Sequence, residues 1–101
     1  MRLKDAFNFR NLTNIVERVR SEKRRQIDKW GEQTHTLEKW LVILAEEFGE
    51  CNKACLEKDY IGLIAELIQL ITVAFNIVDC LLARENSIEY ESAQKERSKN
   101  G

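Results

Sequence analysis

Carboxylates at helical spacing stand in two neighbouring segments of the chain. One segment carries the run EEFGE at 46–50, and the other carries Glu66 alone in a very apolar stretch. If both segments are helices packed antiparallel, Glu47 and Glu50 approach Glu66 across the interface. Carboxylates that meet in a partly dry space repel one another, and Mg²⁺ or Mn²⁺ with oxygen ligands relieves that repulsion. The pattern therefore indicates a divalent-metal site.

A second interpretation stays open for the same residues. Glu46, Glu47 and Glu50 could be solvated residues on a helix surface. Glu66 favours the metal site, because a single acid inside so apolar a helix is hard to explain otherwise. Gly49 lies within the expected helix, where glycine costs up to ~1 kcal/mol relative to alanine. A close approach of another backbone or a ligand beside Glu50 would account for it, and so would chance.

The composition predicts the type of secondary structure that positions these carboxylates. The 101 residues contain no proline and four glycines, with 44% hydrophobic and 33% charged residues. This balance excludes disorder, collagen-like sequence and a turn-rich β-sandwich, and it favours one domain of long helices. We expect helices from Thr13 or Asn14 to Trp30, from Leu37 to about Lys58 and from Ile61 to about Ala83.

The expected fold is an all-α bundle of three to four helices. A domain of this size buries limited apolar surface, so we expect a second copy or a tetramer to complete the bundle. The domain is assigned to residues 1–85. Residues 86–101 form a polar tail, either frayed helix or disordered, with little function.

Two of the expected helices carry clear patterns. The second has one apolar stripe (Leu37, Trp40, Leu41, Leu44, Phe48, Cys51 and Cys55). The third is apolar nearly all round except for one polar arc, which we expect to face a cleft (Glu66, Gln69, Thr72, Asn76 and Asp79). Because a carboxylate near a bilayer centre costs a few kcal/mol, this pattern favours the central helix of a soluble bundle over a membrane span.

Charge is distributed unevenly along the chain. Residues 1–30 hold nine Lys or Arg against four Asp or Glu, a net charge of +5, so the remainder carries −6 of the total of −1. This asymmetry favours the binding of an anionic, metal-bound ligand. Alternatively, the basic and acidic regions of the chain attract one another. Lys23 and Gln26 share the apolar side of the first helix and need polar partners, which marks a place for a ligand. The slightly negative total and the lack of helix-turn-helix spacing argue against nucleic acid.

Three cysteines, Cys51, Cys55 and Cys80, form an odd count with no secretory leader pattern. A reducing cytoplasm is therefore expected. Cys51, Cys55 and His35 could be imagined as a zinc site, but small thiols on an apolar helix face are more typical of core residues.

The chain resembles MazG-like nucleotide pyrophosphohydrolases of the all-α NTP pyrophosphatase superfamily. Their signature E-x-x-E, a spacer and E-x-x-D is matched here by Glu47 to Glu50, a spacer from Cys51 to Ala65, and then ELIQ from Glu66. The upstream stretch RRQIDKWGEQTHTLEKWLVILAEEFGE, with its RQ, KWG, Q and WL, is also similar to that family. The resemblance covers about residues 23–83.

The resemblance implies Mg²⁺-dependent hydrolysis of a (d)NTP to the monophosphate and pyrophosphate by a homo-oligomer. It implies Glu47, Glu50, Glu66 and Gln69 as metal ligands, with Mn²⁺ as another suitable ion. Glu46 or Glu47 would orient the attacking water or accept its proton. The substrate would meet basic residues at its polyphosphate (Lys23, Arg24 and Lys53) and two other residues at its base or sugar (Gln26 and Trp30). Asn76 matches an Asn that follows the motif in many members of the family and would contact the nucleotide.

One departure from the family pattern matters. Gln69 stands where the signature has Asp, so a coordinating oxygen remains but a negative charge is lost. Metal affinity should fall or the arrangement of metals should change. The alternative function is therefore a weakly active or non-catalytic MazG-like module that binds nucleotide or metal, or that dimerises. Neither function involves a membrane.

Overall fold

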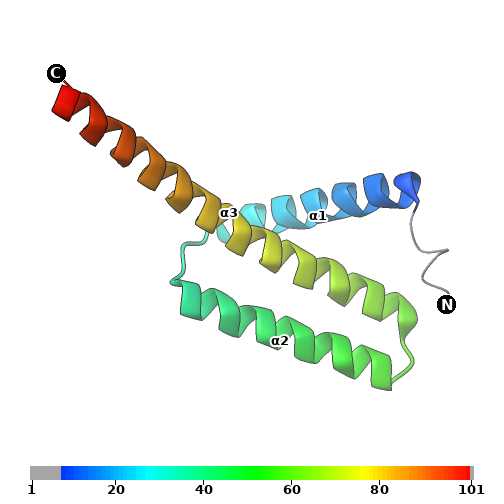
Figure 1. Cartoon of the computed structure of the whole chain (residues 1–101). Coiled ribbons are helices and arrows are strands. Elements are labelled where there is room, and N and C mark those ends of the chain that lie inside the picture. The colour runs from blue at the N-terminus through cyan, green and yellow to red at the C-terminus, as the bar shows by residue number, and fades with distance from the viewer. Residues whose placement is uncertain (1–7, 101) are drawn as a thin grey trace.

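The computed structural model describes residues 8–100, without the side chains of 87–90 and 98–100. Residues 1–7 of the predicted domain and Gly101 of the predicted tail lie outside this range. Residues 8–100 form three α-helices and no strand: α1 (Phe9–Trp30), α2 (Leu37–Leu56) and α3 (Tyr60–Asn100) (Figure 1). The all-α prediction is confirmed for this part of the chain.

Helix α1 begins earlier than predicted. Its N-cap is Asn8, whose side-chain oxygen accepts a hydrogen bond from the backbone N–H of Arg10 at 2.8 Å. Thr13, one of the two expected caps, lies inside the helix and donates its hydroxyl to the carbonyl of Phe9 at 3.1 Å. The other end is as predicted, because Gly31 has φ +75° and its N–H closes the helix onto the carbonyl oxygen of Ile27 at 2.7 Å.

Helix α2 begins where its sequence indicates. The Thr36 hydroxyl oxygen accepts from the backbone N–H of Lys39 at 3.2 Å, as expected for an N-cap. The helix ends at Leu56, two residues before the predicted end near Lys58. Lys58 has φ +57° and therefore cannot continue the right-handed helix. The short turn that follows reverses the chain into α3.

Helix α3 is the central element. Both α1 and α2 pack on it, whereas α1 and α2 do not pack on one another over residues 8–100. Figure 1 shows α2 antiparallel to α3 and α1 on another side, running in the same general direction as α3. The core cluster contains Trp40, Val73 and Ile77, with the half-buried Ile43 and Leu44 against it. The α2–α3 interface is thus the best-packed part of the chain.

The side of α2 that faces α3 differs from the predicted stripe. Trp40, Cys51 and Ala54 are buried, and Leu44 is half-buried. The other members of the predicted stripe are exposed (Leu37, Leu41, Phe48 and Cys55). The prediction was wrong for these residues because α2 has two apolar sides, and the side with Trp40, Ile43 and Cys51 packs on α3. A large apolar side of α2 is left uncovered in the single chain.

The predicted end of the third helix near Ala83 is wrong. Helix α3 continues to Asn100, and its last turns extend beyond the other two helices (Figure 1). Residues 84–100 contain neither glycine nor proline and are rich in helix-forming Glu, Lys, Gln, Arg and Ala. The segment 86–100 of the predicted tail is therefore helical.

Helix α3 is long and apolar enough to cross a membrane by length and composition alone. The candidate span is Tyr60–Arg97, with a mean hydropathy of 2.1 over its most apolar window. The central helix of a soluble bundle passes the same test, so this property does not separate the two classes. The polar arc of α3 faces α1 at Gln69 and Asn76, and a cytoplasmic location stays a prediction.

Candidate functional site

Glu47 of α2 and Glu66 of α3 are both half-buried, and the charge of Glu66 acts on Glu47. The pKa of Glu47 is raised above its ordinary value of 4.5, first because of burial and next because of the negative charge of Glu66. Glu50, Glu22 and Glu46 contribute in the same direction. The antiparallel packing of α2 on α3 therefore brings Glu47 within electrostatic range of Glu66, and the gathering of all these carboxylates around one ion stays a prediction.

Cys51 lies next to the same carboxylates. It is buried, and the pKa of its thiol is raised by burial and then by the charges of Glu66 and Glu47. A thiol in such surroundings stays protonated and unreactive at neutral pH. The predicted core role is confirmed for Cys51, but it is wrong for Cys55 and Cys80, whose side chains are exposed.

One oxygen of this cluster has no hydrogen-bond partner. The Oε2 atom of Glu47 is buried and accepts no bond within the structure. A buried acceptor without a partner is energetically unfavourable, and a cation or its bound water would satisfy it. The nearby ionised donors are carboxylate oxygens, which suit Mg²⁺ or Mn²⁺ better than a softer metal, whereas burial and these charges keep the Cys51 thiol protonated. The residues present therefore fit a magnesium ion in their chemistry.

The side chains as they stand do not form a finished metal site. Among residues 8–100 with described side chains, no group of three or more His, Cys, Asp or Glu is arranged to hold a metal ion. This holds for the carboxylates around Glu47 and equally for Cys51, Cys55 and His35, the zinc alternative. His35 instead places its ring edge-on to Trp40, 4.7 Å between centroids.

The charge of Glu22 on α1 also acts on Glu47, and Glu22 was not among the predicted site residues. Its side chain is only 14% exposed and accepts two hydrogen bonds from Arg25, at 2.7 and 3.0 Å, and one from Gln26 at 3.1 Å. The Arg25 bonds lower the pKa of Glu22, so it stays ionised beside Glu47. The sequence offers one indication that Glu22 could belong to the site. Glu22 directly precedes Lys23, on the side of α1 that carries polar groups toward α3.

Glu22 shares a pocket with Gln69. This pocket of about 390 Å³ lies between α1 and α3 and is also lined by Arg18, Ser21 and Arg25. Gln69 therefore lines the same pocket as an ionised carboxylate of α1. The position where the family signature has a negative charge thus shares its surroundings with a negative charge from α1.

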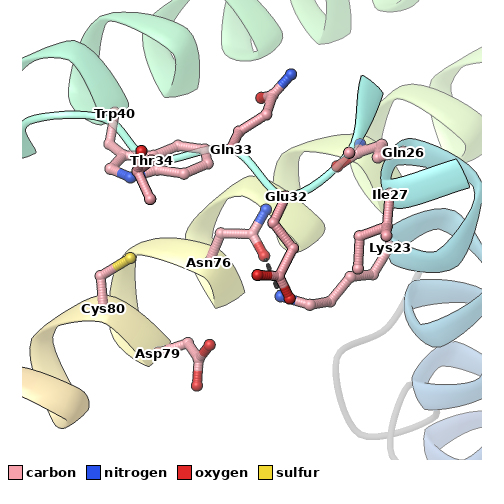
Figure 2. Close-up of a pocket in the computed structure, with 11 residues that line it drawn as sticks. Lys23, Gln26, Ile27, Glu32, Gln33, Thr34, Trp40, Asn76, Asp79 and Cys80 are labelled. Atoms are coloured by element: carbon pink, nitrogen blue, oxygen red, sulfur yellow. Dashed lines mark hydrogen bonds between the residues drawn. The ribbon is translucent and has the colours of Figure 1, made fainter. Parts of the chain in front are cut away.

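A second pocket lies between α1, the following loop and α3 (Figure 2). Lys23 crosses it and donates a hydrogen bond from Nζ to Oδ1 of Asn76 at 2.7 Å. Gln26 lines the same pocket, one turn along α1. Three of the predicted substrate-binding residues are thus brought together.

Several lining residues of this second pocket were not predicted. Glu32, Gln33 and Thr34 come from the loop between α1 and α2, and Asp79 and Cys80 come from α3. Only Asp79 carried a signal, because it lies on the polar arc of α3. The loop residues could not be placed by helical periodicity.

Other predicted site residues lie elsewhere. Arg24 and Lys53 are exposed and line neither pocket. Trp30 is 53% exposed, with the cations of Arg25 and Lys29 over its ring, and it also lines neither pocket. The carboxylates Glu46, Glu47, Glu50 and Glu66 also line neither pocket. Glu47 and Glu66 are half-buried, whereas Glu46 and Glu50 are exposed, as in the second interpretation of these residues.

No family model, no curated protein and no solved structure matches the chain. The similarity to MazG-like proteins rests on the sequence motifs quoted above. Enzymatic activity and metal use are therefore proposals that rest on the residues and their placement.

Proposed function

We propose that this protein is a Mg²⁺-dependent nucleoside triphosphate pyrophosphohydrolase that converts a (d)NTP to the (d)NMP and pyrophosphate. The observation that carries the proposal is the buried, unpartnered Oε2 of Glu47 among the charges of Glu66, Glu50 and Glu22. This arrangement is unfavourable for the folded chain unless Glu47 takes up a proton or a cation compensates its charge. The E-x-x-E and ELIQ motifs supply the same carboxylates in the order typical of MazG-like proteins.

In this proposal Glu47, Glu50, Glu66 and Gln69 would hold the ion. Mg²⁺, when bound, supplies neutralisation of phosphate charge and a lower pKa for a water molecule. Glu46 or Glu47 orients the attacking water or accepts its proton. The raised pKa of Glu47 suits the second role, because a base works best when its pKa lies nearer the working pH. A bond forms between the water oxygen and the α-phosphorus, and the bond from the α-phosphorus to the bridging oxygen breaks, so pyrophosphate leaves.

Lys23, Gln26 and Asn76 support the substrate part of the proposal. They line one pocket between α1 and α3, further along the same polar arc that carries Glu66 and Gln69. Arg24 and Lys53 are exposed, so their proposed contact with the polyphosphate requires a substrate that extends over the outside of the chain or over a second copy.

The direct test is pyrophosphate release from a panel of (d)NTPs with Mg²⁺ or Mn²⁺. We expect the nucleoside monophosphate and pyrophosphate as the two products. Glu66→Gln should lower kcat/KM by about tenfold to a hundredfold or more. Activity falls by this factor even when the residue removed only supports a metal ligand. Glu85→Gln, an exposed carboxylate further along α3 that lines neither pocket, is the matched control. A folded sample that turns over no triphosphate contradicts the proposal.

The alternative function is a non-catalytic module that binds nucleotide or metal, or that dimerises. Two observations favour it. Gln69 lacks the charge of the family Asp, and large apolar residues stay exposed on all three helices, among them Leu12 at 49%, Phe48 at 58% and Val78 at 53%. No residue of α1 is fully buried. A second copy, as a homodimer or homotetramer, would cover these surfaces.

Two measurements separate the functions. Light scattering after size exclusion reports the oligomeric state, and calorimetry with Mg²⁺ and an α,β-imido triphosphate reports binding without cleavage. Binding with no product from the natural triphosphates supports the non-catalytic module. Product formation that requires Mg²⁺ supports the enzyme.

A further inference from the structure

Glu22 brings a negative charge from α1 into electrostatic range of Glu47. Its side chain is 14% exposed, whereas Glu17, the other carboxylate that lines the same pocket, is 58% exposed and paired with Arg20 at 3.3 Å. Water screens an exposed charge strongly and a shielded charge much less. Of these two carboxylates, Glu22 is therefore the one whose charge reaches the interface between α2 and α3.

Three hydrogen bonds hold the Glu22 carboxylate in one orientation. Oε1 accepts from Nη2 of Arg25 at 2.7 Å and from Nε2 of Gln26 at 3.1 Å, and Oε2 accepts from Nε of Arg25 at 3.0 Å. A carboxylate has about four acceptor positions, so Oε2 can accept from one further donor. The Arg25 side chain is 49% exposed, so water screens its charge more than that of Glu22. The negative charge of Glu22 therefore still acts on Glu47 despite this partner.

Gln69 of α3 lines the same pocket as Glu22. Its amide is neutral where the family signature has Asp, so α3 supplies one negative charge fewer to the proposed ion site. Gln69 follows Glu66 by three residues, which is about one turn of the helix. The charge that α3 lacks and the charge that α1 provides therefore belong to the same pocket.

The Oε2 atom of Glu47 gives a separate indication that a donor or a cation belongs in this region. It is buried and has no hydrogen-bond partner within the described part of the chain. Buried acceptors in native proteins are almost always paired. Mg²⁺ usually keeps several of its water molecules in protein sites, and carboxylates outside the direct ligands accept hydrogen bonds from such waters.

We propose that Glu22 supplies to the magnesium site the negative charge that Gln69 does not, as a positioning residue that accepts from metal-bound water and is not itself a metal ligand. This inference rests on the proposed function and extends its site to α1. The sequence motifs imply ligands from α2 and α3 alone. A chain with Gln69 then holds Mg²⁺ without the family Asp, because a charge of the same sign comes from another helix.

The test measures Mg²⁺ binding without nucleotide and without turnover. The full chain is titrated with MgCl₂ in a calorimeter, unmutated and as Glu22→Gln, which keeps the length of the side chain and an oxygen acceptor for Arg25. We expect about tenfold weaker binding, the lower end of the loss found when a residue that supports metal ligands is replaced. Glu17→Gln, exposed in the same pocket, is the matched control and should bind like the unmutated chain. Unchanged affinity in folded Glu22→Gln overturns the inference.

A second comparison separates the charge of Glu22 from a structural role. Glu22→Gln is also introduced into a chain that carries Gln69→Asp, where α3 supplies the charge itself. The loss of Mg²⁺ affinity caused by Glu22→Gln should then shrink to about threefold or less. An equal loss in both chains overturns the inference, because Glu22 would then act independently of residue 69.

Circular dichroism checks that each variant is folded. If Glu22→Gln does not fold, Arg25→Gln decides. This change removes the positive charge that opposes Glu22, and it should tighten Mg²⁺ binding about two- to threefold, as expected for one exposed charge. Unchanged or weaker binding in Arg25→Gln overturns the inference.

The two proposals can fail separately. Weaker Mg²⁺ binding in Glu22→Gln with no hydrolysis of any triphosphate overturns the enzyme and keeps the role of Glu22. Mg²⁺-dependent hydrolysis with unchanged Mg²⁺ affinity in Glu22→Gln overturns the role of Glu22 and keeps the enzyme. An unmutated chain that binds no Mg²⁺ in the titration overturns the role of Glu22, and it overturns the enzyme as well if no triphosphate is hydrolysed.

Discussion

The ammonium group of Lys23 on α1 lies 2.7 Å from the side-chain oxygen of Asn76 on α3, 53 residues later in the chain. The contact is partly buried, and the same ammonium lies over the Phe75 ring. Helix α1 has no fully buried residue, so apolar packing on α3 holds it only in part. This polar contact therefore helps to hold α1 in position beside the pocket that Lys23 crosses.

Breaking the contact should destabilise the fold. Asn76→Ala is expected to lower the free energy of unfolding by about 1–2 kcal/mol, since hydrogen bonds to charged groups contribute at the upper end of the usual range. Urea unfolding followed by circular dichroism measures the change, with the exposed Asn52→Ala on α2 as control. A double-mutant cycle with Lys23→Met isolates the pair, and a coupling energy near zero would show that the contact does not stabilise the protein.

The carboxylates around Glu47 should make stability depend on pH. Because the pKa of Glu47 is raised in the folded chain, the folded state holds a proton above pH 4.5 that the unfolded state has lost. The stability contributed by this proton is present below 4.5 and is lost as the pH rises through the folded pKa. Glu47→Gln removes this dependence, so the variant should gain stability relative to the unmutated chain as the pH rises through that window.

Thermal unfolding at a series of pH values in EDTA measures this effect. Glu85→Gln is the control, and it should follow the unmutated chain. Glu66→Gln should weaken the dependence without abolishing it, because burial, the larger cause of the shift, remains. A Glu47→Gln profile parallel to that of the unmutated chain would show that Glu47 is not perturbed.

Restoring the family carboxylate should strengthen metal binding. Gln69→Asp adds a charged oxygen ligand beside Glu66, and we expect about tenfold tighter Mg²⁺ binding by calorimetry, since ligand charge is a main determinant of affinity for hard cations. Gln94→Asp, exposed near the C-terminal end of α3, adds the same charge away from the site. If both variants titrate like the unmutated protein, residue 69 is not a metal ligand.

Replacing Gly49 should stabilise α2. No other part of the described chain approaches this position closely, because a Cβ here meets no atom within 4 Å. Gly49→Ala should therefore raise the free energy of unfolding by about 0.5–1 kcal/mol, the difference between these residues in a helix interior. Urea unfolding at low protein concentration measures it. A loss of stability instead would indicate that another chain packs against Gly49.

Local signals in the sequence determined much of this protein. The absence of proline predicts long helices, and Thr36 and Gly31 mark the start of α2 and the end of α1 because capping depends on only a few neighbouring residues. The short turn before Tyr60 brings α2 back along α3. Glu47 and Glu66 meet for that reason, since the partner of each lies one hairpin away.

Other features depend on tertiary packing, namely which helix faces are buried and which residues of different helices come together. Periodicity shows that α2 has apolar residues but not which of its two apolar sides turns toward α3, so Leu41 and Phe48 were wrongly placed in the core. Glu22 joins Glu47, and Lys23 joins Asn76, through the packing of α1 on α3. Helical spacing fixes angles within one helix, whereas the rotation and crossing of separate helices depend on packing between residues far apart in the chain.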